Sequence, residues 1–191
     1  MIEVFDTVAA RRMLARRALR CPGCGGPLRP WGRARARTVR DADGSVRTVH
    51  PDRARCTACQ ATHVVLGADV LPRRAYTTRV IGQALLGAAR GQGHRPLAAE
   101  LAVPEGTVRS WLRRARQSAH HLWTLGVQTV VALDPDALPT RERPSMLAHA
   151  VEALVAAAVA VRRHLGGPPV EVWAQIAVLT RGRLLAPSPP G

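Results

Sequence analysis

The sequence contains no lysine, and it has few aromatic residues. All 28 basic residues are arginine, and the aromatic residues are four Trp, one Tyr and one Phe. With so few aromatic rings, the protein cores must be built mainly from Ala, Val and Leu. The missing lysine, together with abundant alanine, is typical of a GC-rich coding sequence. Part of the arginine excess therefore reflects codon supply and carries no functional information.

No segment has the pattern of a membrane span or of a secretory signal. The longest apolar-rich stretch, Met146–Val161, contains His149 and Glu152 and falls short of the ~20 residues that cross a bilayer. The N-terminal segment carries Glu3 and Asp6, and arginines interrupt its apolar residues. We therefore expect a soluble cytoplasmic protein, associated with the nucleoid, that has no membrane partner and keeps its cysteines reduced.

Acidic residues are also scarce, and the resulting charge is unevenly distributed. The net charge is +15 and the isoelectric point is near 11.7. Residues 1–63 contribute +8, residues 64–125 contribute +6, and residues 126–191 contribute only +1. Codon supply alone would spread the arginine excess evenly along the chain. The observed pattern is typical of a chain whose first two thirds bind a polyanion and whose last third is nearly neutral. The distribution predicts a nucleic acid partner, and we expect double-stranded DNA.

The four cysteines form two CxxC pairs, Cys21 with Cys24 and Cys56 with Cys59, separated by 31 residues. A CxxC turn places two thiolates along one edge of a tetrahedral Zn²⁺ site. The intervening segment has two extended arms around an Asp41–Gly44 turn, which predicts a hairpin that brings the pairs together. The expected cofactor is one structural zinc ion, because four thiolates leave no open coordination position.

Two other interpretations of the cysteines remain at this stage. Disulfides are disfavoured in a chain without a secretory signal. A redox CxxC pair begins a helix, and Gly25-Gly26-Pro27 disfavours a helix here. His63, four residues after Cys59, is either an additional ligand or, as we favour, a strand histidine packed beside the site.

Residues 95–114 have the pattern of a helix-turn-helix. Leu97, Ala98 and Leu101 form the apolar face of a first helix, and Val108 and Trp111 belong to the inner face of a second. A preceding helix over 79–89 would support the pair. Ala102 stands where the turn usually has glycine, which is a mild departure from the pattern.

The second helix of such a unit places its N-terminal part in the major groove of DNA. Arginines spaced i, i+4 on its outer face can reach base edges or phosphates. The alternative is a helical bundle whose arginines are only solvated. The candidate DNA-binding residues are Arg95, Thr107, Arg109, Ser110, Arg113 and Arg114.

The order of these motifs resembles that of a known class of protein. The paired cysteines of 21–63, followed by GHRPLAAELAVPEGTVRSWLRR, resemble the N-terminal part of bacterial insertion-sequence transposases and small actinobacterial proteins with the same arrangement. The resemblance covers residues 21–116 and implies binding to the ends of a mobile element. It does not extend to transposase chemistry, because the residues after 125 include only five acidic side chains and leave no room for a nuclease sheet with a carboxylate triad.

The fold class expected is mainly α with a small β zinc ribbon, a helix-turn-helix bundle and a C-terminal helical pair. Helices are expected near 105–124, 145–165 and 169–180. The helix at 145–165 is apolar nearly all round between Ala153 and Val161, so it must be buried, either within the chain or in a homodimer through 145–180. The expected units are an N-terminal basic helix (1–20), the ribbon (21–63), a linker (64–75), the DNA-binding domain (76–125), a second linker (126–144), and the helical pair with a disordered tail (145–191).

These observations favour a non-enzymatic, zinc-stabilised DNA-binding protein, which would be either a transcriptional regulator or a transposase-like module of a mobile element. The alternative is a protein-interaction adaptor that uses the ribbon and the C-terminal helices. An enzyme is disfavoured because the sequence shows no nucleophile–base pair and no open metal site.

Overall fold

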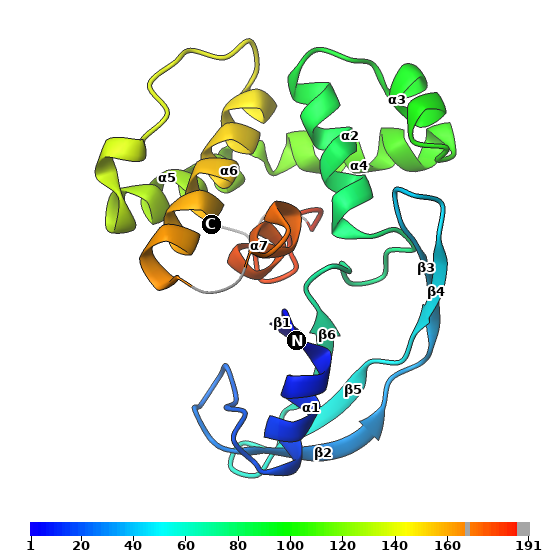
Figure 1. Cartoon of the computed structure of the whole chain (residues 1–191), viewed down its shortest axis with the longest axis vertical. Helices are drawn as coiled ribbons and strands as arrows, with labels where there is room; N and C mark the ends of the chain where they lie inside the picture. The colour runs from blue at the N-terminus through cyan, green and yellow to red at the C-terminus, as the bar shows by residue number, and fades with distance from the viewer. Residues whose placement is uncertain (167–168, 187–191) are drawn as a thin grey trace.

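The computed structural model describes residues 1–166 and 169–186, which form two lobes (Figure 1). One lobe contains the N-terminal helix and a small sheet, and the other contains the remaining helices. The fold is therefore mixed α/β. The sequence predicted a mainly α chain with a small β zinc ribbon, and the helices and the small sheet are both observed. The predicted disordered tail lies outside the described residues, apart from Ala186.

The first lobe is a four-stranded sheet covered by one helix. The strand order is β1 (Ile2–Val4), β6 (Thr62–Gly67), β5 (Asp52–Cys56) and β2 (Leu28–Arg33), with α1 (Thr7–Ala15) packed against it. Only β1 is parallel to its neighbour, and it was not predicted. Asp6 caps α1 by accepting hydrogen bonds from two backbone N–H groups. A small core that includes Leu14, Leu28 and Val65 fills the space beneath α1.

The predicted hairpin is present as a separate two-stranded sheet. Strands β3 (Arg37–Arg40) and β4 (Val46–Val49) flank the Asp41–Gly44 turn. Figure 1 shows this hairpin extending from the first lobe to the start of α2. There the hydroxyl of Thr77 donates a hydrogen bond of 2.9 Å to the Asp41 carboxylate. The hairpin therefore connects the two lobes directly.

Residues 64–75 differ from the linker that the sequence predicted. Strand β6 continues to Gly67, because the apolar run after His63 pairs with β5 and lies against the core. Val70 and Leu71 are also buried, and Val70 packs with Leu66 and with Val39 of the hairpin. The segment is therefore packed structure that joins the lobes.

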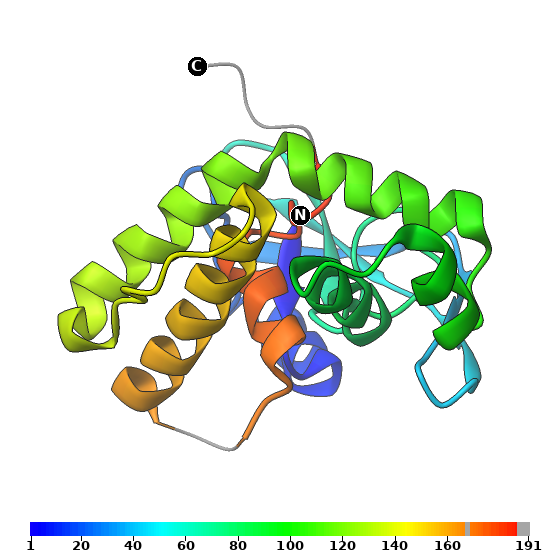
Figure 2. The same cartoon turned by 90° about the horizontal axis from the view of Figure 1, so that it is seen from above.

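The second lobe consists of helices around one large apolar cluster. The helices are α2 (Thr78–Ala89), α3 (His94–Glu100), α4 (Glu105–Gln117), α5 (Ala119–Leu133), α6 (Met146–Leu165) and α7 (Val172–Leu179), with a short 3-10 turn at Pro135–Ala137. The predicted helix over 105–124 is divided at Ser118, and α5 then extends into the predicted second linker. Figure 2 shows the bend between α4 and α5. The Ser118 hydroxyl donates a hydrogen bond of 2.8 Å to the carbonyl of Ala186, which anchors the last described residue at this bend.

The apolar helix α6 is covered within the chain. It packs most extensively on α5, and also on α2 and α7. The crossing with α5 is close because Gly126 faces Ala153, where a Cβ atom would come within 2.7 Å of the Ala153 carbonyl carbon. The predicted alternative of intramolecular burial is therefore observed, and the homodimer through 145–180 stays a prediction. Among the helices described, none combines the length and apolarity needed to cross a membrane.

Candidate functional site

The two CxxC turns share one backbone geometry. The N–H of Cys21 donates to the carbonyl of Gly26 at 2.8 Å, and the N–H of Cys56 donates to the carbonyl of Ala61 at 2.9 Å. The fourth residue after the first cysteine is left-handed in both turns, with φ of 70° at Gly25 and 62° at Gln60. The backbone therefore curls around the sulfurs in the same way twice.

The four cysteine sulfurs meet at the end of the sheet where β2 begins and β5 ends. All four Sγ atoms lie within 4.8 Å of one another, with 3.7 Å between Cys21 and Cys59 and 3.5 Å between Cys24 and Cys56. A tetrahedral ion with metal–sulfur bonds of ~2.3 Å requires sulfur–sulfur edges of about 3.8 Å. No disulfide is formed, and these spacings are compatible with a single metal ion.

The cluster also has the electrostatic character of a cation site. The backbone N–H of Gly23 lowers the pKa of Cys21, and that of Cys59 lowers the pKa of Cys56 to about 6. The Ala61 N–H acts in the same direction on Cys59, but the neighbouring sulfurs of Cys24 and Cys56 raise the pKa of Cys59 to about 12. Neighbouring thiolates oppose each other's ionisation, so four of them require a cation at their centre.

His63 lies beside the cluster, on strand β6. Its Nε2 atom is 3.4 Å from the sulfur of Cys21, and burial lowers its pKa. The spacing suits a hydrogen bond between imidazole and thiolate, which would orient the ligand from outside the coordination shell. The residue therefore occupies the supporting position that the sequence favoured.

Helices α3 and α4 form the predicted helical pair, supported by α2. Leu97 and Ala98 of α3 and Val108 and Trp111 of α4 are all buried. Helix α3 ends at Glu100 with Leu101 as its C-cap, and Ala102 follows with φ of 50°, the left-handed conformation that usually favours glycine at this position.

The predicted DNA-binding residues do not all lie on one surface. Arg109 and Arg113 are exposed on α4, opposite its buried face, whereas Ser110 and Thr107 of the same helix are half-buried. Arg95 is also exposed, but it forms an ion pair of 3.7 Å with Glu105 at the start of α4. Arg114 is half-buried and turns towards a cleft on the other side of the helix.

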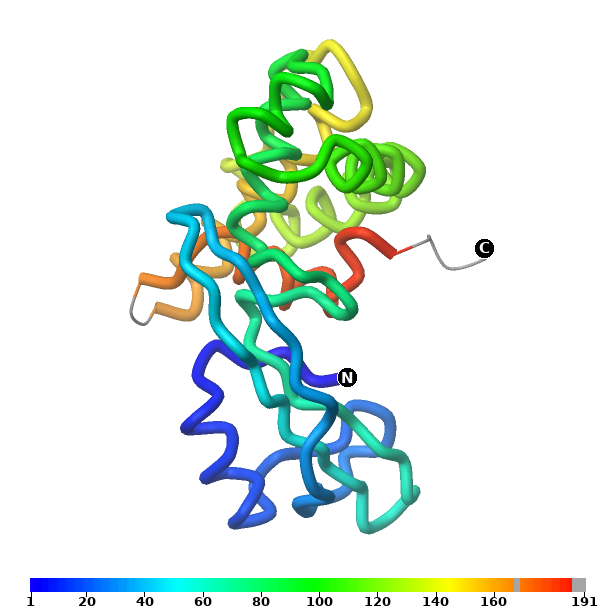
Figure 3. Tube along the Cα trace, turned by 90° about the vertical axis from the view of Figure 1, so that its right-hand side faces the viewer, coloured from blue at the N-terminus to red at the C-terminus, as the bar shows by residue number. Residues whose placement is uncertain are grey.

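The cysteine cluster and the exposed face of α4 belong to different lobes. The CxxC turns connect α1 to β2 and β5 to β6, at the bottom of Figure 1, whereas α3 and α4 lie at the top. The tube view of Figure 3 separates the same two regions from a second direction. A metal at the cysteines would thus stabilise one lobe without contacting a ligand on α4.

Strand β2 presents a group of residues that the sequence analysis missed. Trp31 is 39% exposed, and the guanidinium carbons of Arg29 and Arg55 lie 4.5 and 4.7 Å from its ring centroid. Arg29 and Trp31 are two residues apart, so the sequence could have indicated that they share one face of a strand. Arg55 could not be assigned in this way, because it is placed beside them by the pairing of β5 with β2. Two other arginines of the predicted ribbon (21–63) differ in exposure. Arg33 is exposed, whereas Arg37 is half-buried, and desolvation lowers the pKa of Arg37.

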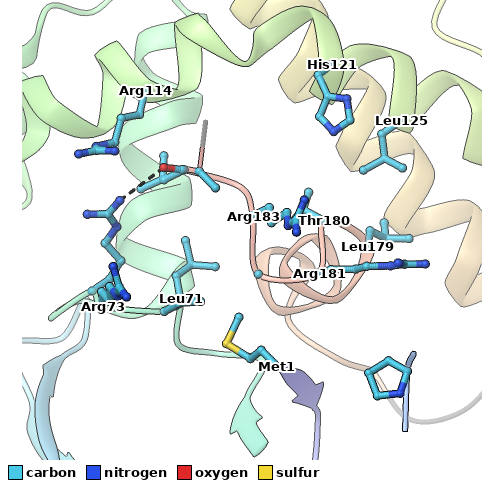
Figure 4. A pocket seen from close by; sticks show the side chains of 16 residues that line it. Met1, Leu71, Arg73, Arg114, His121, Leu125, Leu179, Thr180, Arg181 and Arg183 are labelled. Carbon is cyan, nitrogen blue, oxygen red and sulfur yellow. Dashed lines mark hydrogen bonds between the residues drawn. The ribbon is translucent and has the colours of Figure 1, made fainter. Parts of the chain in front are cut away.

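A basic cleft of about 1120 Å³ lies between the lobes, and the sequence did not indicate it. One side includes Arg114 of α4 and the Leu71–Arg74 segment, and the other includes Thr180–Arg183 after α7 (Figure 4). The two arginines after α7 are more than 65 residues from Arg114 in sequence, so only the fold brings them to one cavity.

Comparison with known proteins gives one match. Residues 21–111 match a family described as a domain of unknown function (DUF6431), and the matched span includes both cysteine pairs and α4 as far as Trp111. No curated protein and no solved structure matches the chain. The description assigns the family no function, so the resemblance to transposases rests on the sequence motifs alone. Over just under half of its length, this chain is therefore similar to the domain of unknown function DUF6431.

Proposed function

We propose that this chain is a metal-stabilised DNA-binding protein, in which four cysteines hold one structural Zn²⁺ and helix α4 enters the major groove of duplex DNA. The main observation in support of the proposal is that α4 has one buried apolar face and one exposed basic face. Val108, Trp111 and Leu112 are at most 2% exposed, whereas Arg109 and Arg113 face the solvent one turn apart. Exposed arginines at this spacing suit the base edges and phosphates of a major groove.

Zinc is the ion that suits the cysteine cluster best. Four thiolates in a tetrahedral arrangement are typical of structural zinc sites, and the sulfur spacings agree with that geometry. When bound, the ion would link the α1–β2 turn to the β5–β6 turn and neutralise part of the thiolate charge. Cys21 and Cys56 are buried and Cys24 and Cys59 are exposed, so each turn supplies one inner and one outer ligand.

The net charge supports the choice of partner. Residues 1–125 carry 22 arginines against eight acidic residues, a net of +14, and a bound Zn²⁺ with four thiolates would lower this to +12. A surplus of this size favours a polyanion and makes binding depend on salt. After residue 125, the described elements are all helical, which supports a role in binding rather than in nuclease chemistry.

The direct test is a DNA-binding titration of the zinc-loaded full chain at ~50 mM salt, where electrostatic attraction to any sequence is already visible. Replacing Arg113 by Ala should weaken binding by about 1–3 kcal/mol if the residue contacts a base, and sequence preference should relax at one position. If Arg113 contacts phosphate instead, binding should weaken evenly across sequences, and the salt slope should fall by about one unit.

The matched control is Arg162→Ala at the end of α6, which removes the same charge from an exposed helical position. It should leave both affinity and sequence preference nearly unchanged. Failure of the wild-type chain to bind random-sequence duplex under these conditions would contradict the proposed function.

A further inference from the structure

The cleft between the lobes is concave, basic and built from distant parts of the chain. Its basic lining residues are Arg73, Arg74, Arg114, His121, Arg181 and Arg183, and none of its lining residues is acidic. Figure 4 shows Arg73 and Arg114 on one side of the opening and Arg181 and Arg183 on the other. The apolar side chains of Leu71, Leu125 and Leu179 also line it.

Two of these arginines are held where their charges are poorly compensated. The Nη2 atom of Arg74 donates to the carbonyl of Leu185 at 3.4 Å, but burial lowers the pKa of Arg74, and the nearby charge of Arg114 lowers it further. The Nε–H group of Arg114 is buried and has no hydrogen-bond partner among the described atoms. Like charges in a partly desolvated cavity repel each other, and an anion would relieve that repulsion.

The backbone is strained at two other arginines that line the cleft. Arg73 has φ of 58° and Arg181 has φ of 49°, in the left-handed region that disfavours side chains other than glycine. Arg181 follows the C-cap of α7, where the N–H of Gly182 donates to Ala177 and the N–H of Arg181 donates to Val178. Glycine is the usual residue at this position of such a helix end.

We propose that this cleft binds phosphate groups, namely those of the DNA backbone beside the major groove that α4 enters. Arg114 follows Arg113 on α4 and lines the cleft, so the cleft lies on one flank of the helix whose outer face the duplex would contact. Guanidinium groups suit phosphate because their fork of N–H donors matches two oxygens at once. The inference rests on the proposed function, and it assigns to Arg181 and Arg183 a role that the near-neutral C-terminal third did not indicate.

The sharpest test replaces Arg181 by Gly, with Arg17→Gly as its matched control. Arg17 has φ of 56° and occupies the same position after α1, outside the cleft. Both variants lose one positive charge and relieve the same backbone strain, so both should melt at or above the wild-type temperature. Any loss of binding in the first variant then cannot be attributed to unfolding.

The first readout is the salt dependence of binding to a random-sequence duplex of ~24 base pairs. Arg181→Gly should reduce the slope of log K against log salt by about one unit, the value expected for one lost phosphate contact, and Arg17→Gly should leave it unchanged. Arg183→Gln, which changes the other arginine after α7, should reduce the slope by the same amount. Equal slopes in the wild type and in both cleft variants would overturn the assignment of the cleft to DNA.

The second readout uses inorganic pyrophosphate, which tests the cleft without DNA. Its addition should shift the NMR signal of the Arg114 Nε–H group in the wild type, and the shift should weaken in Arg181→Gly. A pyrophosphate response without any change of the DNA salt slope would overturn the DNA assignment and identify a site for a small phosphorylated molecule. No response to pyrophosphate and no change of slope would overturn the phosphate site altogether. If the wild type binds no DNA, the proposed function fails, and pyrophosphate alone decides whether the cleft binds phosphate.

Discussion

At the scale of single residues, the proposed zinc site would make the four cysteines the main source of stability in the first lobe. The apolar core beneath α1 is small, and its buried members include Cys21 and Cys56 themselves. Structural zinc contributes an apparent binding free energy of about 10–16 kcal/mol in small zinc domains, more than such a core supplies. The stability of the lobe should therefore follow metal occupancy.

The variant Cys24→Ser should remove the bound zinc and unfold residues 21–63, because three thiolates and a hydroxyl hold the ion far more weakly. Metal analysis should return one zinc per chain for the wild type and much less for the variant. The control is Ala58→Ser, which introduces a hydroxyl at an exposed position between Cys56 and Cys59 and should keep full occupancy. Purified wild-type protein with no zinc and with its thiols joined as disulfides would rule out the metal site.

At the scale of helices, four helix ends share one backbone geometry, although the residue type at the left-handed position differs among them. After α1, α2, α3 and α7, the chain forms the same pair of backbone hydrogen bonds around a left-handed residue. Only α2 has glycine there, at Gly91, whereas Arg17, Ala102 and Arg181 occupy the other three positions. A side chain at such a position costs stability, because its Cβ atom crowds the backbone.

Ala102→Gly should therefore stabilise the protein by about 0.5–1 kcal/mol, as the strain that is relieved exceeds the entropy that glycine adds to the unfolded chain. The control is Ala99→Gly within α3, the same substitution at an exposed helical residue, which should destabilise by about 0.8–1 kcal/mol. Urea titrations of the two variants should give changes of opposite sign. A loss of stability in both would show that the turn after α3 does not hold Ala102 in the left-handed conformation.

At the scale of the whole molecule, two separate cores imply two steps of unfolding. The helical cluster around Ile81, Trp111 and Leu154 shares no member with the cluster that contains the cysteines. The lobes meet through the hairpin, including the hydrogen bond from Thr77 to Asp41, and through the smaller cluster of Val39, Leu66 and Val70. Only the first lobe contains the cysteine cluster, so only this lobe would depend directly on the proposed metal.

A zinc chelator should accordingly unfold the first lobe and leave the helices folded. In hydrogen exchange, amides of β5 and β6 should lose protection, whereas those of α2 and α6 should keep most of theirs. The same chelator saturated with zinc beforehand is the control and should change nothing. Simultaneous loss of protection in both lobes would mean that the hairpin and the intervening segment unite them into one cooperative unit.

The sequence by itself determined the features that depend on local spacing. Two CxxC pairs predicted that the four cysteines meet, and the fold brings their sulfurs within 4.8 Å, because each turn is specified by a few adjacent residues. The same holds for the hairpin at Asp41–Gly44 and for the buried faces of α3 and α4, where apolar periodicity indicates the inner side. Helix boundaries were less accurate: the division at Ser118 accompanies a contact with the distant carbonyl of Ala186.

Only the tertiary structure decided what depends on contacts between distant segments. Strand β6 replaced the first third of a predicted linker, because β5 and β1 lie on either side of it and pair with it. Helix α6 is buried by α5, α2 and α7. The apolar periodicity within α6 shows that it must be buried but cannot identify these partners. The basic cleft is the clearest case. Its arginines come from three segments, and in sequence those after α7 belong to a nearly neutral third of the chain. Charge can be counted along a chain, but its concentration in a cavity exists only where folding brings the segments together.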